Sequence, residues 1–120
     1  MTGMRRALCL AASAGLLAVH PAAASAATAG ENLDCAMWAA YRINDAQDDA
    51  ERNALMIAMA LFVGLYEGQT GKNVDEAMVA RARELDESQF DVLEEPCSAR
   101  LDSFADRLEA LGRRLGASGH

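Results

Sequence analysis

Few side chains in this sequence are suited to catalysis or to metal binding. Of its two histidines, His20 lies in an apolar N-terminal stretch and His120 ends a Gly-Ala-Ser-Gly tail. Neither position holds a histidine inside a folded site, so histidine-based catalysis and histidine-ligated zinc are disfavoured. The single lysine, Lys72, lies in a glycine turn that is too short to be a phosphate loop. We therefore expect a non-enzymatic protein with no metal and no cofactor.

Carboxylates are abundant, with eighteen acidic residues against eleven basic ones. The acidic cluster in the segment 45–51 lacks the residue order and the terminal glutamate of a calcium loop. Acidic residues in the first turn of a helix interact favourably with its dipole, which explains the cluster better. A glycosidase-like carboxylate pair is the one enzymatic alternative, although only 5% of the residues are aromatic and could stack on a sugar.

The N-terminal stretch has the pattern of an export signal. Two arginines precede an apolar run at 7–19, and Pro21 separates that run from small residues. Two Ala-x-Ala sites follow, ending at Ala26 and Ala29, and we favour cleavage after Ala26. Residues 1–26 are thus predicted to be a signal peptide, and the mature protein is predicted to be periplasmic or secreted.

Cleavage after Ala26 would leave 94 residues, enough for one small domain. Within it we expect a flexible segment at 27–31, a helical domain at 32–115 and a flexible tail at 116–120. Nine basic residues then face eighteen acidic ones. Nucleic acid and anionic membrane surfaces are poor partners for such a chain, because they carry the same charge.

Two cysteines remain in the mature chain, Cys35 and Cys97. An isolated pair in an oxidising compartment predicts a disulfide. Closing a loop of this length contributes about 4 kcal/mol in the chain-entropy model. A redox-active role is not expected, since the pair lacks the Cys-x-x-Cys spacing.

The apolar periodicity predicts an all-α bundle of four to five short helical elements, linked by the one disulfide. Asn32 or Asp34 is expected to cap the first helix, and Asn73 the third, while Pro96 is expected to restart the chain. The predicted elements are 32–44, 48–67, 73–85, a short turn or helix at 87–93, and a last helix from Pro96 to about Leu115.

The run 54–66 is the most apolar stretch, ALMIAMALFVGLY. As a helix it would be about 20 Å long, too short to cross a bilayer. Because it is apolar on every face, we expect the other helices or a second copy to cover it. Rows of alanine and glycine along it suit either packing within the chain or a homodimer contact. The predicted interaction surface comprises Leu55, Met59, Phe62, Gly64 and Tyr66.

The last helix carries a regular apolar seam, with steps of four and three residues. Its members are Cys97, Leu101, Phe104, Leu108, Leu111 and Leu115. Since Cys97 begins this seam, the disulfide is expected to join the last helix to the first.

In layout, the chain resembles small exported helical proteins of unknown function from proteobacteria. The resemblance is carried by Cys35, by the segment 62–68 with sequence FVGLYEG, and by Cys97 with the leucines that follow it. It implies a helical fold and no known activity. The order of the two cysteines around an apolar helix is also similar to periplasmic acid-stress chaperones of the HdeA type, which are small, helical and dimeric.

Two functions follow as expectations. The first is a periplasmic or secreted interaction module, which contacts a partner protein or a second copy through the helix at 54–66. The alternative is an acid-activated chaperone. Below about pH 3 its carboxylates would be neutralised, and the remaining basic residues would repel one another and loosen the bundle.

Overall fold

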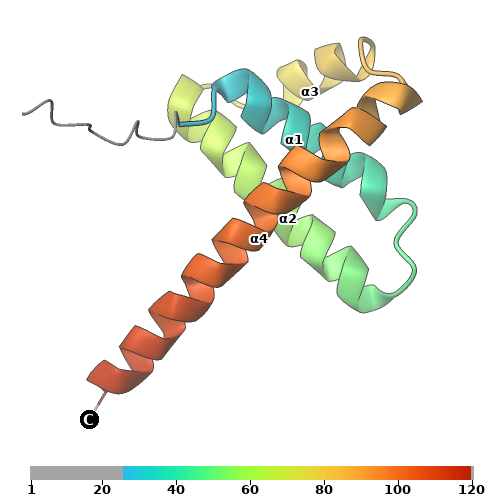
Figure 1. Ribbon diagram of the computed structural model, residues 1–120. Helices are drawn as coiled ribbons and strands as arrows, with labels where there is room; N and C mark the ends of the chain where they lie inside the picture. The colour runs from blue at the N-terminus through green and yellow to red at the C-terminus, as the bar shows by residue number, and fades with distance from the viewer. Residues whose placement is uncertain (1–25, 120) are drawn as a thin grey trace, which may run out of the picture.

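The computed structural model describes residues 26–119, which form four α-helices and no strand (Figure 1). This confirms the predicted all-α class. Most of the predicted signal peptide, residues 1–25, lies outside the described part. The helices are α1 (Ala29–Ile43), α2 (Asp49–Thr70), α3 (Asp75–Ala82) and α4 (Glu87–Ser118).

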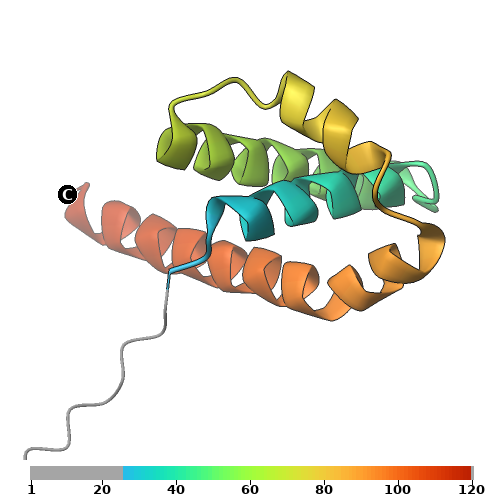
Figure 2. The same ribbon diagram turned by 90° about the horizontal axis from the view of Figure 1, so that it is seen from above.

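The first helix, α1, lies at the centre of the fold. It contacts each of the other three helices, and its residues 35–39 are all buried. Figure 2 shows α1 with α2 and α3 on one side and α4 on the other. The sequence predicts α2 for this place because α2 is more apolar. However, α2 lies at the edge of the bundle, and only Leu55, Ala58 and Phe62 are buried in it.

The start of α1 differs from the prediction. We expected a flexible segment at 27–31 and a cap at Asn32 or Asp34, but the helix begins at Ala29. The Thr28 hydroxyl accepts a hydrogen bond from the Glu31 backbone N–H, and the Glu31 carboxylate accepts one from the Thr28 N–H. This capping box satisfies two free amides and so extends the helix towards the N-terminus.

The second helix begins as predicted and ends later. Asp48 caps it, since its carboxylate accepts a hydrogen bond from the Glu51 backbone N–H at 2.8 Å. The helix passes through Gly68 and ends at Gly71, which has a left-handed backbone with φ 65°. Of the two glycines, Gly71 is therefore the one whose conformational freedom the turn requires.

The third helix is shorter than predicted and covers α1 rather than α2. Asn73 does not cap it, because its side chain accepts a hydrogen bond from the Asp75 N–H and forms a local turn instead. An ion pair joins α3 to α1, with Arg81 Nε 2.6 Å from Asp34 Oδ1.

No single helix among residues 26–119 has the length and hydropathy of a membrane span. The helices α2 and α3, bent by 112° at their break, meet those criteria only as a pair.

The fourth helix runs without interruption through Pro96, where a restart was expected. Proline removes one backbone hydrogen bond, and Figure 2 shows α4 bending in its orange first third. Contacts to the bundle hold this first third in place. The Phe90 ring stacks on Tyr41 of α1 with centroids 4.2 Å apart, and Leu93 packs against the core.

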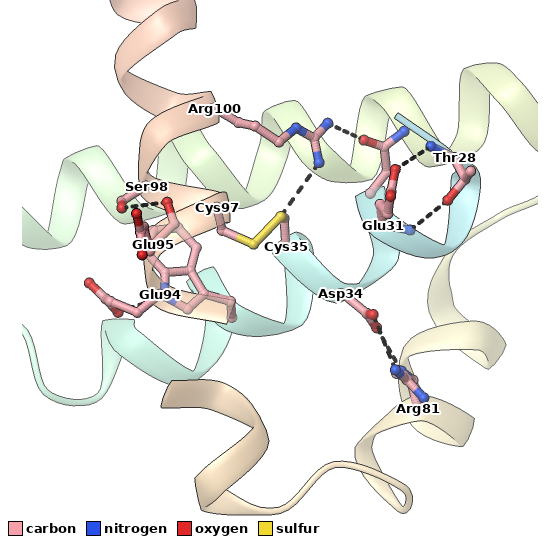
Figure 3. Close-up of a disulfide and its surroundings, with 12 residues drawn as sticks. Thr28, Glu31, Asp34, Cys35, Arg81, Glu94, Glu95, Cys97, Ser98 and Arg100 are labelled. Atoms are coloured by element: carbon pink, nitrogen blue, oxygen red, sulfur yellow. Dashed lines mark hydrogen bonds and ion pairs between the residues drawn. A yellow bond between two sulfur atoms is a disulfide. The ribbon is translucent and has the colours of Figure 1, made fainter. Parts of the chain in front are cut away.

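The predicted disulfide between Cys35 and Cys97 is present and joins α1 to α4, with Cα atoms 5.3 Å apart. Both cysteines belong to the buried core. Beside the disulfide, the Trp38 indole N–H donates a hydrogen bond to Glu94 at 2.8 Å, which adds a second link between the two helices (Figure 3).

This packing makes a testable distinction between two large apolar residues of α2. Phe62 is fully buried, whereas Ile57 is 58% exposed. Replacing Phe62 by alanine leaves a cavity and should lower the free energy of unfolding by about 3 to 5 kcal/mol. The control Ile57→Ala should cost less than about 1 kcal/mol. Chemical denaturation of the chain without residues 1–26 measures both, and equal losses would contradict this assignment of the core.

Candidate interaction surface

The structure separates the predicted surface residues of α2. Leu55 and Phe62 are buried in the core, so they are core residues of the single chain and not surface residues. Met59 and Tyr66 are half-buried, and only Gly64 is exposed. The reason is the helical period, which turns Leu55 and Phe62 towards α1. An apolar run alone does not reveal which of its faces the neighbouring helix will cover.

The opposite side of α2 is uncovered. The residues on this side are all exposed and lie on one face of the helix. Among them, Met56 is 52% exposed and Ile57 is 58% exposed. A Cβ atom added at Gly64 would meet no other atom within 4 Å, so this end of the face is open. We call this surface the outer face of α2; it comprises Asp49, Asn53, Met56, Ile57, Ala60 and Gly64.

A second uncovered surface lies on α4. Beyond Phe104 the helix extends past the other three helices, as Figures 1 and 2 both show in red. We call residues 105–118 the arm. The apolar seam continues along it, and Leu108, Leu111 and Leu115 are 46%, 44% and 63% exposed. The seam was predicted from the sequence, but only its first half finds a partner within the chain.

A groove of about 380 Å³ lies between α2 and α4, next to the start of the arm. Leu61 and Leu65 line it from α2, and Phe104 lines it from α4. The guanidinium groups of Arg100 and Arg107 lie along the same groove. The groove therefore combines an apolar wall with two cations, in a chain whose charge is otherwise acidic.

Arg100 is the half-buried cation of this region, and no ion pair joins it to a carboxylate among residues 26–119. Its guanidinium donates hydrogen bonds to the side-chain oxygen of Asn32 and, at 3.5 Å, to the sulfur of Cys35 (Figure 3). It also lies 4.8 Å from the centre of the Phe62 ring. Burial lowers the pKa of Arg100, and the charge of Glu31 partly opposes that shift.

Asn32 connects three helices through one buried amide. It is 1% exposed, accepts the hydrogen bond from Arg100 of α4, and donates one to Gln69 of α2 at 2.6 Å. From the sequence, Asn32 was predicted to cap a helix, and no role was predicted for Arg100. No charge pattern in the sequence sets Arg100 apart, since Arg107 and Arg114 also lack an acidic residue three or four positions away.

Within residues 26–119 no group of three or more histidine, cysteine, aspartate or glutamate side chains is placed to hold a metal ion. What this region does present is exposed apolar surface beside arginines, which suits binding.

The amide network gives a second prediction. Asn32→Ala would remove the side-chain oxygen that accepts from Arg100 and the N–H that donates to the side-chain oxygen of Gln69. Removing one member of a buried hydrogen-bonded set costs about 1 to 3 kcal/mol, so the free energy of unfolding should fall by that amount. The matched control is Asn53→Ala on the exposed outer face, which should change stability by less than about 0.5 kcal/mol. A loss of the same size in both variants, measured by urea denaturation, would show that the network adds no stability.

Comparison with known proteins finds no relative of this chain. No family model, no curated protein and no solved structure matches this chain. The resemblances drawn from the sequence layout therefore stay predictions, and the candidate surface is interpreted from its own geometry.

Proposed function

We propose that this chain is a small non-enzymatic interaction module, which binds a protein partner through the arm and the outer face of α2. One observation carries the proposal: Leu108, Leu111 and Leu115 form an exposed row on one side of the arm. Single exposed apolar residues are common on protein surfaces, but contiguous apolar rows rimmed by charged residues are typical of contact sites.

The arm is separate from the packing that holds the chain together. The core cluster and the residues packed against it extend along α4 only as far as Leu101. Leucines beyond this point contribute little to the packing of the single chain. A partner that covers them would bury apolar area at about 25 cal/mol per Å², which is a favourable contribution to binding.

The proposed location is the periplasm or the extracellular space. Disulfides form and persist in oxidising compartments, and the link between Cys35 and Cys97 fits such a location. The predicted signal peptide supports the same assignment. The acid-activated chaperone stays a prediction from the sequence.

A hydrophobic dye tests the proposed contact surface. An environment-sensitive dye should fluoresce with the chain lacking residues 1–26 in dilute solution, where no partner covers the row on the arm. Replacing Leu108 and Leu111 together by glutamine, a good helix former, should reduce that fluorescence by roughly half while the helix content is kept. The control is Val92→Gln, since Val92 is 75% exposed on α4 but lies outside the arm. Unchanged fluorescence in the double variant would refute the proposed surface.

A further inference from the structure

We infer that the partner of the arm is a second copy of this chain. In the inferred dimer the arm of each copy lies on the outer face of α2 in the other copy. The inference rests on the proposed function and names its partner. Since both arms are exchanged between the same two copies, the contact closes as a twofold dimer and does not propagate into a filament.

Charge is divided unevenly between the arm and the rest of the chain. Residues 26–104, here called the body, carry sixteen acidic and six basic side chains, a net charge of −10. The arm carries three arginines against Asp106 and Glu109, a net charge of +1. An arm of one copy is therefore attracted to the body of another, whereas two bodies repel each other.

Individual charges on the two surfaces lack ion-pair partners within residues 26–119. On the arm, Arg113 pairs with Glu109, but Arg107 and Arg114 form no ion pair. On the body, Asp45 and Asp49 are exposed and form none either. They lie just before α2 and at its start, next to the apolar part of the outer face.

The two surfaces also match in length and polarity. The arm has fourteen residues and is about 21 Å long, while the outer face of α2, from Asp49 to Gly64, is about 24 Å long. Both present apolar residues next to charged ones: the three leucines with Arg107 and Arg114 on the arm, and Met56 and Ile57 with Asp49 on α2. Small residues at the far end of the outer face allow a second helix to approach closely.

The arm does not cover the outer face of its own chain. In Figure 1 the arm extends to the lower left, whereas the first half of α2 extends to the lower right. Figure 2 likewise shows the arm and the start of α2 at opposite ends of the molecule. A contact between these two surfaces therefore requires two copies.

The test uses two complementary charge-reversed variants of the chain lacking residues 1–26. The arm variant carries Arg107→Glu and Arg114→Glu, and the body variant carries Asp45→Arg and Asp49→Arg. For each variant alone, the dissociation constant of the dimer should be at least about tenfold higher than for the unmodified chain. Mixed together they should form a heterodimer, because each exchanged contact then joins opposite charges. Sedimentation velocity over a concentration series measures both effects, with circular dichroism to show that each variant is folded.

The control is Arg83→Glu, an exposed arginine of the body outside both surfaces, which should leave the dimer intact. A dimer that persists in the body variant, or a mixture that stays monomeric, would overturn the inferred contact. If the unmodified chain is monomeric but its arm still binds the dye, the second copy is ruled out and the proposed function is retained. A monomer whose arm binds no dye would refute both the inferred dimer and the proposed function.

Discussion

The disulfide between Cys35 and Cys97 is the constraint on which the rest of the structure depends. It fixes α4 to the central helix at a point nearer the start of α4 than its end. Three further contacts hold this first part: the ring stack of Tyr41, the hydrogen bond of Trp38 and the buried amide of Asn32. Beyond the groove with α2, which Phe104 and Arg107 still line, α4 extends past the other three helices (Figures 1 and 2). The bridge thus determines where packing ends and where exposed apolar surface begins.

Much of the fold could be predicted because its causes are local in the sequence. Apolar spacing predicted the helices, the start of the second helix was placed near Asp48, and the cysteine pair predicted the disulfide. The errors concern long-range packing. The continuity of α4 through Pro96 depends on contacts that hold its first turns, and the central place of α1 depends on which helices surround it. Neither is visible in a stretch of the chain read alone.

The candidate surface could likewise be predicted only in part, because its exposure depends on long-range packing. A run that is apolar on all sides, such as 54–66, does not indicate which side becomes core, so Leu55 and Phe62 were assigned to a surface and are buried. The seam on α4 was predicted correctly as an apolar row. Its exposure could not be predicted, because that depends on where the neighbouring helices end. The role of Asn32 could not be predicted either, because it depends on α1, α2 and α4 lying close together in space.

The central claim is that one chain folds around α1 and leaves the arm uncovered. Backbone amide hydrogen exchange, measured for the chain lacking residues 1–26 in dilute and in concentrated solution, tests it most directly. We expect slow exchange in residues 35–39 at both concentrations, and exchange in the arm that is fast in dilute solution and slower in concentrated solution. Arm amides that are as strongly protected in dilute solution as those of residues 35–39 would contradict it.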